Sequence, residues 1–126
     1  MLNTEKYRSV RWLKGGRVHP ELDCFGVVNE IRGDLGLPLY PDFAGVTKDG
    51  GGLDRSAKEY IQKMIKCSPE PGALALCFSG SVVTHVGIVI VLDDCLKVAE
   101  CNPGINVTFV DLARFIRRFS RVEFWQ

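Results

Sequence analysis

The chain has 126 residues, a net charge of +1, and a composition that is 46% hydrophobic and 25% charged. This balance predicts one globular domain over residues 1–126 and excludes disordered, collagenous and coiled-coil proteins. The near-neutral charge provides no general field that would attract nucleic acid. No apolar run reaches the roughly 20 residues that a membrane span requires. Because the polar segment 1–14 has no signal-peptide core, we expect synthesis in the cytoplasm.

The first half of the chain is predicted to be helical, after about twenty polar and irregular residues. Apolar residues recur at helical spacing over 24–35, directly behind Asp23, which is a suitable N-cap. The glycines and prolines of residues 37–52 predict a loop. A second apolar stripe predicts a helix over 53–66, with its cap at Asp54 or Ser56.

The second half of the chain is predicted to form a sheet. Apolar, β-branched runs separated by turn residues predict strands over 73–78, 82–92, 95–101, 105–110 and 122–125, the last at an edge. A helical stripe is expected over 112–119. Helices followed by strands predict an α+β fold, with the helices packed on one face of an antiparallel sheet. Four arginines at helical spacing indicate either a solvated helix face or an anion-binding stripe: Arg114, Arg117, Arg118 and Arg121.

The cysteine pattern argues against disulfides and metal. There are five cysteines, no CxxC pair and only two histidines, so no zinc site is predicted and reduced thiols are expected. We therefore expect no metal and no cofactor. Cys77, Cys95 and Cys101 lie in predicted strands and are interpreted as small core residues.

Cys24 has a different setting from the other cysteines, because it follows the predicted helix cap. Free amides and the helix dipole in a first helical turn favour a thiolate and can hold an oxyanion. A thiolate nucleophile needs a partner base. His19 lies in a polar loop, whereas His85 lies in a predicted central strand, where it is either an ordinary half-buried histidine or that base. A cysteine at a helix start followed by a strand histidine is the papain-type layout, and it predicts Cys24 as the reactive thiol.

Four motifs in this chain resemble those of the NlpC-like cell-wall hydrolases, which are papain-like cysteine peptidases. They are Leu-Asp-Cys-Phe-Gly-Val-Val at 22–28, Pro-Gly-Ala-Leu-Ala-Leu-Cys-Phe at 71–78, Thr-His-Val-Gly-Ile-Val at 84–89, and Gly15-Gly16. The resemblance spans about residues 10–112 and keeps the family's order and spacing. It implies a papain-like α+β fold, with N-terminal helices packed on a central antiparallel sheet.

The resemblance also implies a reaction. Cys24 would attack an amide carbonyl of a peptidoglycan stem peptide, and His85 would take the thiol proton and return it to the leaving amine. The family's third polar residue corresponds to Glu100, which would orient His85, with Asn102 as the alternative because asparagine has this role in papain.

Three further residues are expected near the substrate. Asp23 is either only the helix cap or a group that also binds a peptide amine. Trp12 and Phe25 replace polar residues of the family, a tyrosine and a serine, and we expect them to form one wall of the substrate cleft. The other interpretation of Phe25 is a core residue of the first helix.

Two other functions stay open at this point. The domain could be a non-catalytic cell-wall-binding or phage-tail assembly module, or a thiol enzyme that acts on a protein target, such as a deamidase or toxin. Leu-Gly-Leu-Pro-Leu-Tyr-Pro-Asp at 35–42 resembles the phage-tail branch of the family. The expected partners are peptidoglycan or its peptide fragments, with phage-tail or secretion-apparatus proteins as further candidates. Delivery would then use a phage tail or another export route.

Overall fold

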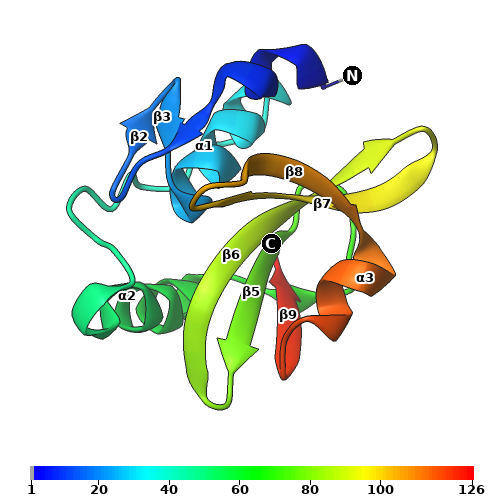
Figure 1. The fold of residues 1–126 in the computed structure, drawn as a ribbon. Coiled ribbons are helices and arrows are strands. Elements are labelled where there is room, and N and C mark those ends of the chain that lie inside the picture. The colour runs from blue at the N-terminus through cyan, green and yellow to red at the C-terminus, as the bar shows by residue number, and fades with distance from the viewer. Residues whose placement is uncertain (1) are drawn as a thin grey trace.

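The computed structural model describes residues 2–126, and its main feature is a curled six-stranded sheet (Figure 1). All neighbouring strands in this sheet are antiparallel. The strand order is β4-β9-β5-β6-β7-β8. The α+β class predicted from the sequence is therefore confirmed. The bounds are β4 Lys66–Cys67, β5 Leu74–Ser79, β6 Val82–Leu92, β7 Cys95–Asn102, β8 Asn106–Asp111 and β9 Arg121–Trp125.

The first twenty residues are more ordered than their polar composition predicts. A 3-10 helix, Thr4–Ser9, leads into a small three-stranded sheet of β1 Arg11–Trp12, β2 Arg17–Val18 and β3 Glu21–Leu22. The small sheet is tied to the large one, because the backbone N–H of Trp12 donates to Asn106 Oδ1 over 2.9 Å at the start of β8. Two-residue strands carry too little pattern to be predicted from sequence.

Helix α1, Cys24–Asp34, begins and ends where its sequence predicts. The side chain of Asp23 accepts a hydrogen bond from the Gly26 N–H over 2.8 Å, which confirms the predicted N-cap. At the other end Gly36 adopts a φ of 73°, a left-handed conformation that glycine accepts without strain. The helix packs against β6 and β7, so its first turn lies close to the centre of the sheet.

Helix α2, Gly52–Tyr60, is shorter than the predicted helix over 53–66. A 3-10 turn, Ile61–Lys63, follows it, and then Met64 becomes extended. The backbone N–H of Ile65 donates to Gln126 O over 2.8 Å, and β4 pairs with β9. Hydrogen bonding to a distant strand therefore ends the helix, and the N-cap is Gly51 rather than Asp54 or Ser56.

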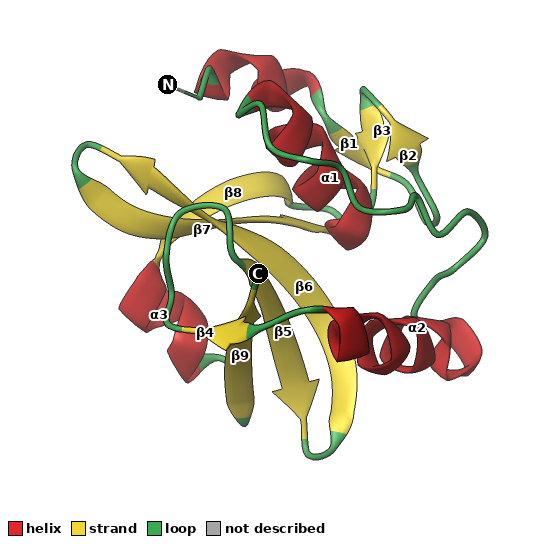
Figure 2. Ribbon diagram, turned by 180° about the vertical axis from the view of Figure 1, so that it is seen from behind, coloured by secondary structure: helices red, strands yellow, loops and turns green. Residues whose placement is uncertain are grey.

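The sheet carries apolar side chains on both faces, and the helices are divided between them. Helices α1 and α2 contribute to a core with Leu76 and Ile88, whereas α3, Leu112–Arg117, contributes Phe115 to a second core with Val89 (Figure 2). The helices thus do not all lie on one face. No helix within residues 2–126 has the length and apolar character needed to cross a membrane.

Two smaller predictions about this sheet are wrong. Strand β9 was expected at an edge, but it lies between β4 and β5. Cys95 was expected in the core, but it lies at the tip of the β6–β7 hairpin and is exposed. Cys77 and Cys101 are buried as expected.

Candidate active site

Cys24 is the first residue of α1 and lines a cavity. The cavity has a volume of about 230 Å³ and is lined by residues of the small sheet, the first turn of α1 and the loop before α2. Three expected substrate-site residues line it together with Cys24: Trp12, Asp23 and Phe25. The structure therefore brings together four of the six residues that the sequence singles out.

Phe25 takes part in both of the roles that the sequence leaves open. Its ring lines the cavity, yet the residue is only 8% exposed and belongs to the core. The ring centroid lies 5.4 Å from that of Phe43 and 6.4 Å from that of Tyr40. The cavity wall at this point is therefore the outer side of an aromatic core cluster.

Asp23 forms an ion pair with a neighbouring cation. Arg17 Nη1 lies 2.7 Å from Asp23 Oδ1, the same oxygen that caps α1. Arg17 also donates to the carbonyl oxygens of Asp42 and Val46, so one side chain ties the helix start to the loop over it. A peptide amine at Asp23 would meet an existing ion pair, and the amine-binding role stays a prediction.

His85 is held from one side by Glu100. The two residues lie on neighbouring strands, β6 and β7, and His85 Nε2 is 2.8 Å from Glu100 Oε1. Both side chains are almost completely buried, at 3% and 1% exposure. The predicted contact between Glu100 and His85 is therefore present. The ring of His85 also stacks on Phe119, with centroids 5.9 Å apart and planes 19° apart.

Glu100 has two further partners besides His85. Asn102 Nδ2 donates to Glu100 Oε1 over 3.0 Å, so Asn102 supports the carboxylate instead of contacting the imidazole. Arg118 donates to both carboxylate oxygens. Burial by itself would raise the pKa of Glu100, but the hydrogen bonds from its three partners outweigh it and lower that pKa to about 2. The carboxylate is thus ionised at any ordinary pH.

An ionised Glu100 determines which nitrogen of His85 carries the proton. A carboxylate can only accept hydrogen bonds, so Nε2–H of the imidazole donates to it. Burial lowers the pKa of His85, and the charges of Lys48 and Arg118 act in the same direction, whereas Glu100 opposes them. At neutral pH the ring is therefore uncharged, and Nδ1 carries a free lone pair. Nδ1 is buried and has no hydrogen-bond partner in the described structure.

Cys24 approaches strand β6 at Val86, the residue after His85. The backbone N–H of Val86 interacts with the Cys24 sulfur. Within residues 2–126, no hydrogen bond joins this sulfur to His85 Nδ1, because the nitrogen has no partner. The Cys24 sulfur thus lies near the residue that follows His85, without a hydrogen bond to the imidazole.

The predicted thiolate character of Cys24 is wrong for this conformation. Burial raises the pKa of Cys24 to about 11, the charge of Asp23 adds to the effect, and Lys48 and the Val86 N–H only partly oppose it. The side chain is 4% exposed. A first-turn position favours a thiolate only where the sulfur is also solvated or paired with a cation. In the resting protein the Cys24 thiol is thus neutral, as is the His85 imidazole.

Sequence reasoning missed Arg118 as part of this site. The helical spacing of four arginines predicts that Arg118 belongs to one stripe with Arg114, Arg117 and Arg121. In the structure α3 ends at Arg117, so the four arginines do not share one helix face. Arg118 binds Glu100, whereas Arg121 pairs with Glu123. No signal in the sequence links an arginine after a helix to a glutamate 18 residues earlier. No group of three or more residues that could hold a metal ion occurs within residues 2–126.

Comparison with known proteins adds no further identification. A scan of protein-family models finds no match to this chain, and a search of curated proteins finds no significant match either. The NlpC-like resemblance therefore rests on the four sequence motifs alone.

Proposed function

We propose that this protein is a thiol-dependent amide hydrolase of the NlpC-like, papain-like type. The observation that carries the proposal is the arrangement around His85. Its Nε2 is held by an ionised carboxylate, its Nδ1 is buried and free, and the strand segment that bears it also contacts the thiol of a helix-start cysteine. A buried nitrogen without a hydrogen bond is uncommon unless it has a task.

The reaction begins with a neutral thiol and a neutral imidazole. Cys24 Sγ attacks the amide carbonyl carbon, and the thiol proton passes to His85 Nδ1. The resulting imidazolium is stabilised by Glu100, which remains ionised throughout. The backbone N–H of Cys24, in the first turn of α1, has no partner within the helix and is available to the oxyanion. His85 then gives its proton to the leaving amine, and water hydrolyses the thioester.

A peptidoglycan stem peptide is the proposed substrate, on the strength of the family resemblance. The cavity agrees with a peptide that has both apolar and charged groups. Trp12 and Phe25 provide an apolar wall, while Lys48 and Asp49 line the side formed by the loop. Because the Cys24 thiol is 4% exposed, the substrate carbonyl has to enter this cavity to reach it.

The second candidate is a non-catalytic cell-wall-binding or phage-tail module. The low exposure and raised pKa of Cys24 favour it, because a functional nucleophile is normally accessible and activated.

One experiment separates the two candidates. Purified peptidoglycan is incubated with the wild-type protein, with Cys24→Ala, and with Cys95→Ser as a control that removes an exposed thiol. Mass spectrometry of the soluble products is expected to show one newly cut amide with the wild type and with Cys95→Ser, and none with Cys24→Ala. Binding to peptidoglycan without any product would favour the module. Cleavage of model peptides but not of peptidoglycan would indicate a protein target.

A further inference from the structure

Arg118 lies just after α3 and reaches back to the buried carboxylate of Glu100. Its Nη2 donates to Glu100 Oε1 over 3.0 Å, and its Nη1 donates to Oε2. This two-point contact fixes the plane of the carboxylate, which a single donor would leave free to rotate. Since Oε1 is also the oxygen that accepts from His85, the same contact fixes where the imidazole is held.

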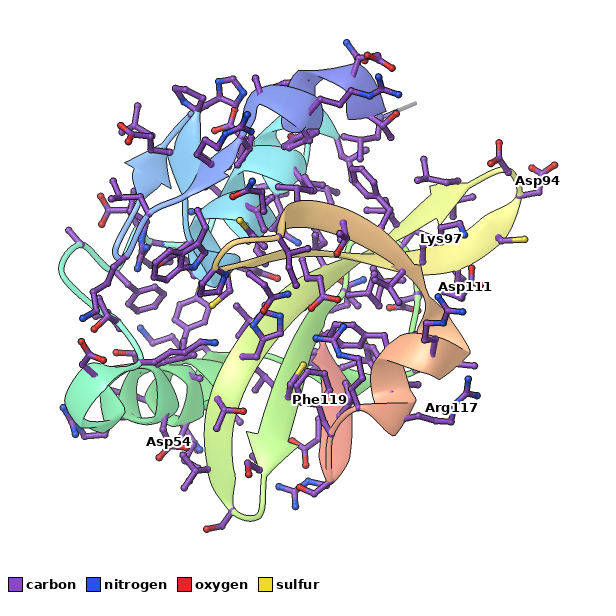
Figure 3. All side chains as sticks on the ribbon, viewed as in Figure 1. Asp54, Asp94, Lys97, Asp111, Arg117 and Phe119 are labelled. Carbon is purple, nitrogen blue, oxygen red and sulfur yellow. The ribbon has the colours of Figure 1, made fainter. Side chains whose placement is uncertain are left out.

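The guanidinium is itself held by aromatic rings. It lies 5.5 Å from the ring centroid of Phe115 and 5.1 Å from that of Phe119. Phe119, which follows α3, is also the ring that stacks on His85. It points towards the sheet, whereas Arg117 at the end of α3 points away from the protein (Figure 3). Arg118 is therefore packed against the same aromatic group as the imidazole.

We propose that Arg118 is a positioning residue for His85, which acts by clamping Glu100 so that the imidazole keeps Nε2 protonated and Nδ1 open. This role rests on the proposed hydrolase function, because the open Nδ1 is what accepts the thiol proton. Without the clamp, the carboxylate can turn, and the imidazole can adopt the other tautomer. That tautomer places hydrogen on Nδ1, where it cannot act as a base.

The charge of Arg118 has a second effect. The charged groups that act on His85 are Glu100 from β7, Arg118 after α3 and Lys48 from the loop before α2. The thiol of Cys77 lies opposite in the β5–β6 pair and is kept neutral by burial, which raises its pKa. Because Arg118 opposes Glu100, its removal leaves the carboxylate uncompensated and raises the pKa of His85.

The test uses the imidazole nitrogens as a direct readout. Two-bond ¹H–¹⁵N correlation spectra distinguish the two tautomers, and His19→Gln assigns the signals because the chain has two histidines. The wild type is expected to show only the tautomer with Nε2 protonated. Arg118→Met, which keeps the apolar stem, is expected to show a mixture of tautomers and a raised His85 pKa. A wild-type tautomer and an unchanged pKa in Arg118→Met would overturn the proposal.

Kinetics on a cleaved substrate provide the second readout. Arg118→Met is expected to lower kcat by about tenfold or more, with KM little changed, because Arg118 does not line the cavity. Arg117→Met removes an exposed arginine next to it and is the matched control, for which kcat is expected to stay within about twofold.

Arg118→Lys is the second variant, for the case that Arg118→Met does not fold. It keeps the positive charge next to Glu100. A lysine has no planar fork for two oxygens, so kcat is expected to fall several-fold while the His85 pKa stays close to the wild-type value. Wild-type kcat in Arg118→Lys would show that no clamp is needed and would refute the positioning role. If the wild type cleaves no amide, the proposed function fails, but the imidazole spectra still decide the role of Arg118.

Discussion

Replacing Glu100 with glutamine tests the centre of the proposed site. Glu100 is 1% exposed, and its two oxygens accept from His85, Asn102 and Arg118. Glutamine offers one oxygen, so at least one donor loses its acceptor, and the Arg118 charge loses its partner. Breaking a buried ion pair costs about 3–5 kcal/mol, but Arg118 is 41% exposed and can turn to solvent. We therefore expect a loss of about 2–3 kcal/mol in the free energy of unfolding.

The catalytic effect of Glu100→Gln should be larger than its effect on stability. An amide holds the imidazole less firmly and does not stabilise the imidazolium, so kcat is expected to fall by roughly 10²–10⁴-fold. Asn102→Ala removes one donor to Glu100 and is the matched comparison, with an expected cost of about 1 kcal/mol and a fall in kcat below about tenfold. Urea unfolding and steady-state kinetics measure both. If Asn102→Ala lowers kcat a hundredfold and Glu100→Gln does not, Glu100 is not the third member of the site.

Three further results are expected. The pKa of Glu100 lies below its ordinary value, so the stability that it contributes, about 3 kcal/mol, is present above pH 5 and lost as the pH falls towards 2. Urea unfolding across this range should show the loss. In Glu100→Gln the unfolding free energy should depend less on pH over the same range. In the free protein, iodoacetamide at pH 7 should label exposed Cys95 before Cys24. The pKa of Cys24, about 11, leaves only about one Cys24 side chain in ten thousand as thiolate at this pH. Peptide mapping that shows Cys24 reacting first would contradict this. Phe25→Ser should lower the unfolding free energy by about 3–5 kcal/mol, because Phe25 packs in the core; a loss below about 1 kcal/mol would instead indicate a purely cleft-lining role.

Local signals in the sequence were sufficient for the central strands. The Val- and Ile-rich run over 82–92 matches β6. Asp93 and Asp94 both adopt positive φ, as a type I′ hairpin turn requires. Such signals failed for residues 61–66, because Ile61, Met64 and Ile65 have helical spacing although the backbone there turns into a 3-10 turn and then a strand. Pairing of β4 with β9, more than fifty residues later, decides between the two.

Most residues of the candidate site could be named from the sequence, but Arg118 and the electrostatics of the site could not. Asp23 and Cys24 follow from helix-capping rules, and the motif register singles out Glu100 as the partner of His85. The pKa of Cys24 depends on how deeply the sulfur is buried, which only the packing of α1 on β6 determines. Arg118 was missed for the same reason, since a contact between a helix end and a distant strand has no spacing rule.

The position of β9 has a consequence for how the nascent chain folds. Strands β5 and β6 can pair as soon as both have been synthesised, but β9 fills an inner position between β4 and β5 and is made last of these strands. Until residues 121–125 emerge from the ribosome, the apolar β5 has an open edge on that side, which can pair with other chains. We therefore expect C-terminally truncated or stalled chains to aggregate, and chaperones that bind extended apolar segments to associate with β5 during synthesis.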